Sequence, residues 1–188
     1  MRRGFTRTEA AIVLGSIAVV AAIAIAWLSA SRGNAYDAAA ASNMHAYAKA
    51  QTMYIKTDWD GDNQKKYATP FTNLYMDATA ANKMHKLIDK GFYDATVATA
   101  LKQGFYFGDL TQVATVAINW AADYGLCGAP GSYGRSGTKV FVIQVDGRPT
   151  STDAENLQVG VLDGQVVNLI ADYPGAAQML AQKWIEAE

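Results

Sequence analysis

Residues 10–28 read AAIVLGSIAVVAAIAIAWL, nineteen consecutive residues without a charge. As an α-helix this stretch would rise about 28 Å, close to the thickness of the hydrocarbon core of a bilayer. Trp27 lies where an interfacial aromatic residue is expected, and Arg2 and Arg3 precede the stretch. Basic residues on this side predict a membrane helix whose N-terminal end stays in the cytoplasm, with the rest of the chain outside.

Three interpretations fit an apolar segment at this position. The first is an uncleaved membrane anchor. The second is an ordinary secretory signal, which would be cut after the apolar core, near the small residues at 24–26 or 29–31. The third starts from Glu9, because a carboxylate at the mouth of a membrane helix is costly and is usually retained for a function or a partner.

Residues 2–9, RRGFTRTE, resemble the prepilin signal of type IV pilins and type II secretion pseudopilins. In that family a short basic leader ends in Gly, the mature chain begins with Phe, and a Glu lies five residues into the mature chain. These positions correspond here to Gly4, Phe5 and Glu9. The resemblance implies that a prepilin peptidase cuts between Gly4 and Phe5 and then methylates the new amine.

The resemblance also implies that Phe5 and Glu9 act in assembly. Cleavage would free an α-amine on Phe5, and Glu9 of a neighbouring subunit could pair with it as both helices leave the lipid, because a neutralised pair is tolerated there. The implied product is a helical filament of identical subunits, built by inner-membrane assembly machinery. The chain departs from the family at Arg7 and Thr8, which are usually apolar, and at Ala26, which is often proline.

The expected organisation has three parts. Residues 1–4 form the leader, residues 5–33 the membrane-spanning and filament-core helix, and residues 34–188 an extracytoplasmic head. We expect a single-pass inner-membrane protein with a cytoplasmic N-terminus and a periplasmic or extracellular head, which becomes part of a surface filament after assembly. The expected fold class is α+β, with the long helix continuing as a stalk that packs on a small antiparallel sheet, as in pilins.

The long helix is predicted to continue to about residue 57, since residues 34–57 contain neither Gly nor Pro. Tyr36, Met44, Tyr47 and Tyr54 fall on one face of this stretch. An aromatic ligand-binding face is the alternative interpretation. The periodic stripe favours a seam that packs against the head.

Further elements are predicted from period-two alternation and turn residues. They are a helix over residues 79–90, strands over 104–108, 112–120 and 139–145, a hairpin of strands over 157–162 and 165–170, and a terminal helix over 176–188. Residues 125–137 are interpreted as a Gly-rich loop that carries Cys127, the only cysteine. A single cysteine excludes an intramolecular disulfide, and without a nearby His the thiol is not expected to be a nucleophile.

An acidic segment follows the long helix. Asp58, Asp60 and Asp62 match the alternating oxygen ligands at the start of an EF-hand-like loop, which predicts a calcium site. Asn63 stands where Gly is expected and Thr69 where a bidentate Glu should close the site, so another carboxylate would have to complete it. The alternative is a turn held by side-chain-to-backbone hydrogen bonds.

Other function classes are disfavoured. The chain carries 16 Lys and Arg against 17 Asp and Glu, a balance that argues against a nucleic-acid partner. It contains no familiar catalytic motif, and His45 and His85 are expected as solvated histidines on two separate helices, so we expect no enzyme and no cofactor beyond calcium. The alternative function is a membrane-anchored extracytoplasmic binding module that does not polymerise, which would need only the apolar length.

Overall fold

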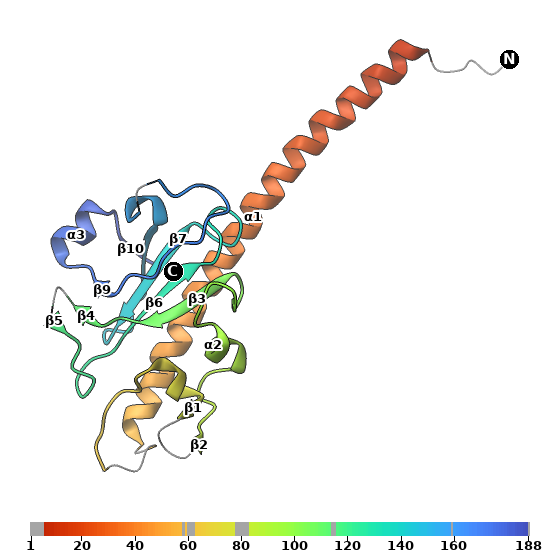
Figure 1. Cartoon of the computed structure of the whole chain (residues 1–188). Coiled ribbons are helices and arrows are strands. Elements are labelled where there is room, and N and C mark those ends of the chain that lie inside the picture. The colour runs from red at the N-terminus through yellow and green to blue at the C-terminus, as the bar shows by residue number, and fades with distance from the viewer. Residues whose placement is uncertain are drawn as a thin grey trace.

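The computed structural model describes residues 6–57, 59, 63–77, 83–113, 116–158 and 160–187. A single helix, α1 (Arg7–Lys56), runs 50 residues without a proline and projects far beyond a small head (Figure 1). It ends at Lys56, and the C-cap residue Thr57, which has an extended backbone, donates its N–H to the carbonyl oxygen of Tyr54. The predicted continuation of the apolar N-terminal helix into the head is therefore confirmed.

The described part of the head consists of short elements. The helices and 3-10 helices are η1 (Phe71–Leu74), α2 (Lys90–Asp94), η2 (Ala154–Asn156) and α3 (Ala176–Ala181). The strands are β1 (Met76–Asp77), β2 (Lys83–Met84), β3 (Phe105–Asp109), β4 (Gln112–Val113), β5 (Val116–Ala117), β6 (Gly125–Pro130), β7 (Lys139–Gln144), β8 (Thr150–Asp153), β9 (Asp172–Tyr173) and β10 (Ile185–Glu186). The α+β class is confirmed.

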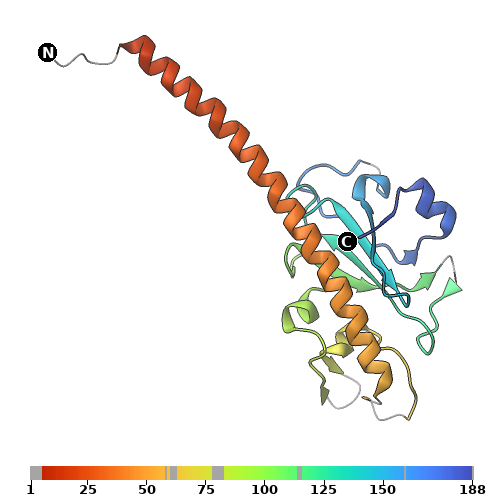
Figure 2. The same cartoon turned by 180° about the vertical axis from the view of Figure 1, so that it is seen from behind.

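Five strands form the central antiparallel sheet in the order β10-β8-β7-β6-β3. Phe141 on β7 lies opposite Gly128 on β6 and Ser151 on β8, so these three residues share one face of the sheet. The helix α1 crosses this face (Figure 2). Two small sheets, β1-β2 and β5-β4-β9, lie beside the central one.

The central sheet separates two hydrophobic cores. One lies under α1, where Met44 and Tyr47 pack with Phe107 and Phe141. The other lies on the opposite face, where residues 157–184 cover the sheet with side chains such as Trp184. The head therefore has three layers, which are α1, the central sheet and the segment of residues 157–184.

Polar side chains fasten α1 to the head at the level of these cores. The amide of Gln51 is completely buried; its Nε2 donates to the carbonyl oxygen of Ala68 at 2.9 Å, and its Oε1 accepts the Ala68 N–H at 2.8 Å. Asn43 donates to Gln103 Oε1 at 3.1 Å. The predicted tyrosine seam is also confirmed, with Tyr47 and Tyr54 buried and Tyr36 partly buried.

The predicted Gly-rich loop at 125–137 is wrong over its first half, which is β6, with all six residues buried. Its glycine at 128 is explained by close packing: a Cβ there would lie 2.8 Å from Met44 Cε and from Phe107 Cε1. From the sequence alone, a strand glycine that leaves room for a neighbouring helix cannot be distinguished from a glycine in a loop.

The predicted hairpin at 157–170 is also wrong, since the described part of this segment contains no strand. Its backbone bonds to other segments: Val167 donates to the carbonyl oxygen of Pro130 and accepts the hydroxyl of Tyr106, and Tyr133 donates its N–H to Gln165. The predicted strand 112–120 instead reverses into β4 and β5, where Val113 pairs with Val116.

Two helix predictions need correction. The predicted helix 79–90 is wrong in its described part, because residues 83–84 form β2 and the helix α2 begins at Lys90, with Asp89 as its N-cap. The predicted terminal helix 176–188 stops at Ala181. Lys183 then takes a left-handed conformation with φ of 54°, and β10 joins the sheet opposite Ser151.

Candidate functional site

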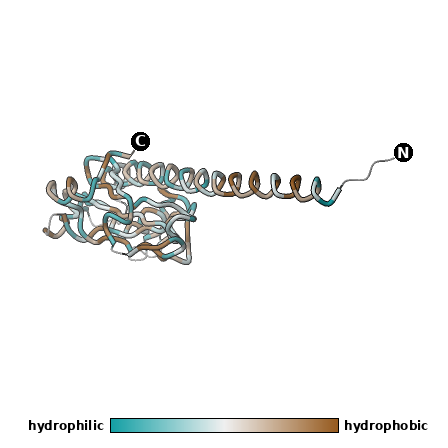
Figure 3. Tube along the Cα trace, turned by 90° about the horizontal axis from the view of Figure 1, so that it is seen from above, coloured by the Kyte–Doolittle hydropathy of each residue, from teal (hydrophilic) through white to brown (hydrophobic). Residues whose placement is uncertain are grey.

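The part of α1 outside the head is the candidate functional segment, here called the free half of α1 (residues 7–32). None of its side chains is buried, and large aliphatic residues such as Leu14 and Ile25 are about two-thirds exposed, at 67% each. Hydrophobic colour predominates along this helix between a hydrophilic tip and the head, whereas the half inside the head is mixed (Figure 3). A helix that is apolar all round belongs in lipid or in a packed bundle.

By length and composition this helix could cross a membrane, and a signal sequence near an N-terminus would pass the same test. Two serine hydroxyls inside it are satisfied within the helix. Ser16 and Ser29 each donate a hydroxyl proton to the carbonyl oxygen four residues earlier, at 2.9 and 3.0 Å. Such internal bonding removes the main penalty for serine in an apolar environment.

Glu9 lies at the tip of the free half in a capping box with Thr6. Its Oε2 accepts hydrogen bonds from the Thr6 backbone N–H and hydroxyl, both at 2.8 Å, and the Thr6 oxygen accepts the Glu9 N–H at 3.2 Å. Both bonds to the carboxylate fall on one oxygen, so the other can accept a donor from a second chain. Thr6 was missed from the sequence, although T-x-x-E before an apolar run is the capping-box pattern.

Asp37 anchors α1 where it enters the head. Its two oxygens accept the backbone N–H and the hydroxyl of Thr138, at 3.3 and 3.4 Å. Burial raises the pKa of this carboxyl to about 6, against the lowering effect of its hydrogen bonds and of nearby Lys139. A Cβ at Gly137 would lie 2.6 Å from Asp37 Oδ1, so this position must be glycine for the anchor to form.

The predicted processing and calcium residues cannot be placed. Gly4 and Phe5 lie outside the described residues, as do Asp58, Asp60 and Asp62. Within the described ranges no group of three or more His, Cys, Asp or Glu side chains could hold a metal ion. The calcium site therefore stays a prediction.

The two histidines differ. His45 is exposed on α1, as predicted. His85 is not a solvated helix residue: it follows β2, is 8% exposed, and stacks edge-on between Tyr54 and Trp59, with ring centroids 5.8 and 4.9 Å away. His85 is therefore a buried histidine of the hydrophobic core.

Cys127 lies on β6 and is completely buried. Burial raises the pKa of its thiol to about 12, and its sulfur accepts the N–H of Ile170 at 3.4 Å. A thiol in this state is a poor nucleophile. The free half of α1, with Glu9 at its tip, is therefore the feature that distinguishes this molecule from an ordinary small α+β domain.

Comparison of the chain with protein-family models, curated proteins and solved structures found no match.

Proposed function

We propose that this protein is a structural subunit of a filament of the type IV pilus or type II secretion pseudopilus kind. The observation that carries the proposal is the division of α1. One half packs into the head through buried residues, and the other half is uncharged from residue 10 to residue 28, with Arg7 and the Glu9 carboxylate at its tip. A monomeric anchor needs only the apolar length, so Glu9 favours assembly.

The physical case concerns where the apolar surface goes. Before assembly the free half lies in lipid, and in a filament the same surface packs against the free halves of neighbouring subunits. Hydrocarbon environments penalise an isolated charge, so Glu9 needs a partner in the bundle. The sequence resemblance supplies one, the α-amine that cleavage between Gly4 and Phe5 would free on an adjacent subunit. Cleavage, methylation and assembly by inner-membrane machinery are part of this proposal.

The first test is the mature N-terminus. Mass spectrometry of the full-length product from a host with a prepilin peptidase should find a chain that starts at Phe5 and carries a methylated amine. A start beyond Ala26 would instead indicate an ordinary signal peptide. An intact Met1 would favour the monomeric membrane-anchored binding module.

The second test is Glu9→Ala. Removing the carboxylate makes the helix more apolar, so membrane insertion should be unchanged. The amine of a neighbouring subunit would lose its partner, at a cost of about 3–5 kcal/mol. Filaments recovered by shearing and pelleting should therefore be strongly reduced, whereas the nearby control Thr8→Ala should assemble normally. Equal filament yields from wild type and Glu9→Ala would contradict the role of the charge.

A further inference from the structure

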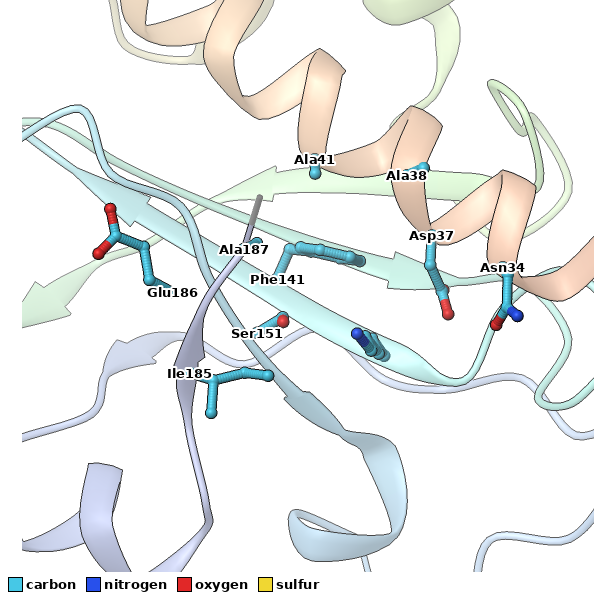
Figure 4. A pocket seen from close by; sticks show the side chains of 10 residues that line it. Asn34, Asp37, Ala38, Ala41, Phe141, Ser151, Ile185, Glu186 and Ala187 are labelled. Carbon is cyan, nitrogen blue, oxygen red and sulfur yellow. The ribbon is translucent and has the colours of Figure 1, made fainter.

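A cleft of about 400 Å³ lies between α1 and the edge strand β10 (Figure 4). It exists because α1 lies over β6 and β7, while β8 and β10 extend the same face of the sheet beyond the helix. Asp37 and Ala38 of α1 form one wall, and Ile185 forms the other. Its volume falls within the range of about 300–1,000 Å³ that is usual for small-molecule sites.

The floor of the cleft belongs to a row of side chains that crosses three strands. Ser151 of β8 lies opposite Phe141 of β7 on one side and opposite Ile185 of β10 on the other. Directly paired residues share a face of the sheet, so all three side chains lie on the α1 face. The floor is therefore apolar except for one hydroxyl at its centre.

That hydroxyl is an unusual feature of the cleft. Ser151 is completely buried, and its oxygen has no hydrogen-bond partner among the described residues. An unpaired buried hydroxyl is unfavourable, and alanine would occupy the position without this cost. Figure 4 shows the Ser151 oxygen on the side of the cleft. The neighbouring Ile185 is 58% exposed, so its side chain can change rotamer and let a ligand reach this oxygen.

Opposite charges line the cleft from two different elements. Lys139, two residues before Phe141 on β7, lies on the same face and diagonal to Ser151. Its ammonium forms no ion pair within the described part of the chain. Asp37 faces the cleft from α1, and its pKa of about 6 leaves this carboxyl mostly ionised above pH 7.

We propose that this cleft binds a zwitterionic amino acid with an apolar side chain. Lys139 and Ser151 donate hydrogen bonds to the carboxylate of the ligand, and Asp37 accepts one from its ammonium. The apolar side chain lies against Phe141 and Ile185. A simple anion would lie beside Asp37 and a simple cation beside Lys139, so a ligand with both charges fits the lining best.

The site belongs to the head and does not depend on the proposed filament. Glu186, the other carboxylate in the lining, already pairs with Arg148 at 3.9 Å. The charges left for a ligand are therefore one positive and one negative.

Three probes with the same carbon skeleton test the ligand class. They are L-leucine, 4-methylpentanoate, which lacks the amine, and 3-methylbutylamine, which lacks the carboxylate. Calorimetric titration of the detergent-solubilised full chain at pH 7.5 should give a Kd of about 0.1–1 mM for L-leucine. The other two probes should bind at least about tenfold more weakly, because each leaves one charge of the cleft without its partner.

Ser151→Ala and Lys139→Met test the residues. Each should weaken L-leucine by about tenfold and leave 3-methylbutylamine unchanged, because both residues contact the carboxylate. The matched control is Lys49→Met, which removes an exposed lysine of α1 outside the cleft and should bind like wild type. Ser151→Ala should melt at or above the wild-type temperature, because it removes an unpaired hydroxyl.

Several outcomes would overturn the site. They are no saturable binding of L-leucine, equally tight binding of either single-charge probe, or wild-type affinity in both cleft variants. Each of these results would leave the filament proposal standing, because filament assembly is measured separately by shearing and pelleting.

Discussion

Two aspartates inside the head have pKa values raised mainly by burial, Asp37 to about 6 and Asp109 to about 7. Each holds a segment in place. Asp37 ties α1 to the start of β7, and Asp109, at the end of β3, accepts the Phe71 N–H at 2.9 and 3.2 Å. Both carboxyl groups therefore accept structural hydrogen bonds whose strength depends on their protonation state.

Asp109 makes the stability of the head depend on pH. Its folded-state pKa of about 7 lies above its ordinary value of 3.8, so the folded state binds the proton more tightly. The free energy of unfolding should fall by up to about 1.4 kcal/mol per pH unit as the pH rises from about 4 to 7, and then level off. Thermal unfolding of the detergent-solubilised full chain between pH 4.5 and 8 measures this.

Asp109→Asn is the control for that prediction, because it keeps an acceptor oxygen for Phe71 and removes the titration. The stability difference between wild type and variant should change between pH 4 and 7 and stay constant above pH 7. Parallel pH curves for the two proteins would contradict the assignment. The contribution of Asp37 has the same sign but ends near pH 6, and it cancels in the comparison.

At the scale of elements, glycine has opposite roles in α1 and β6. A Cβ added at Gly33, within the helix, would meet no other atom within 4 Å, whereas Gly128 lies under the packed side chains of Met44 and Phe107. The same substitution should therefore have opposite effects at the two positions.

Gly33→Ala should stabilise the protein by up to about 1 kcal/mol, because alanine restricts the unfolded chain and favours the helix. Gly128→Ala should destabilise it by about 1–3 kcal/mol through overpacking. Thermal unfolding of the two variants beside wild type measures both. A melting temperature that moves in the same direction for both would show that the close approach at Gly128 relaxes freely.

These elements also explain what the sequence could predict. Apolar length and the tyrosine stripe indicate α1, and aromatic or β-branched runs indicate β3 and β7, because these signals lie within one segment. The strands β6 and β8 carry no such signal. The residues of β6, GLCGAP, have small side chains because α1 crosses this strand. The residues of β8, TSTD, are polar, yet the two central ones are buried in a strand that lies between β7 and β10 in the sheet.

The candidate site divides in the same way. Glu9 could be predicted because its motif is local, and Thr6 could have been found from its spacing to Glu9. The cleft between α1 and β10 could not be predicted, because it needs β10, near the C-terminal end of the chain, to lie beside β8 and α1.

For the whole molecule, Cys127 serves as an internal reporter of unfolding. It is completely buried in the central sheet, so a thiol reagent should reach it only when the head opens. Labelling of the native full chain by DTNB should be slower by orders of magnitude than labelling in guanidinium. In Ser42→Cys the added exposed thiol should react at once, and rapid native labelling of Cys127 in wild type would contradict its burial.

The continuity of α1 has a mechanical consequence. Fifty helical residues without proline form a rod of about 75 Å, and the head grips only one end of it. Such a rod is a lever: a tilt of about ten degrees at the head moves the tip sideways by roughly 7 Å, more than the rise of one helical turn. A rotation of the head therefore displaces Glu9, and the angle at which Asp37 and Gln51 hold α1 against the head determines the position of the helix tip.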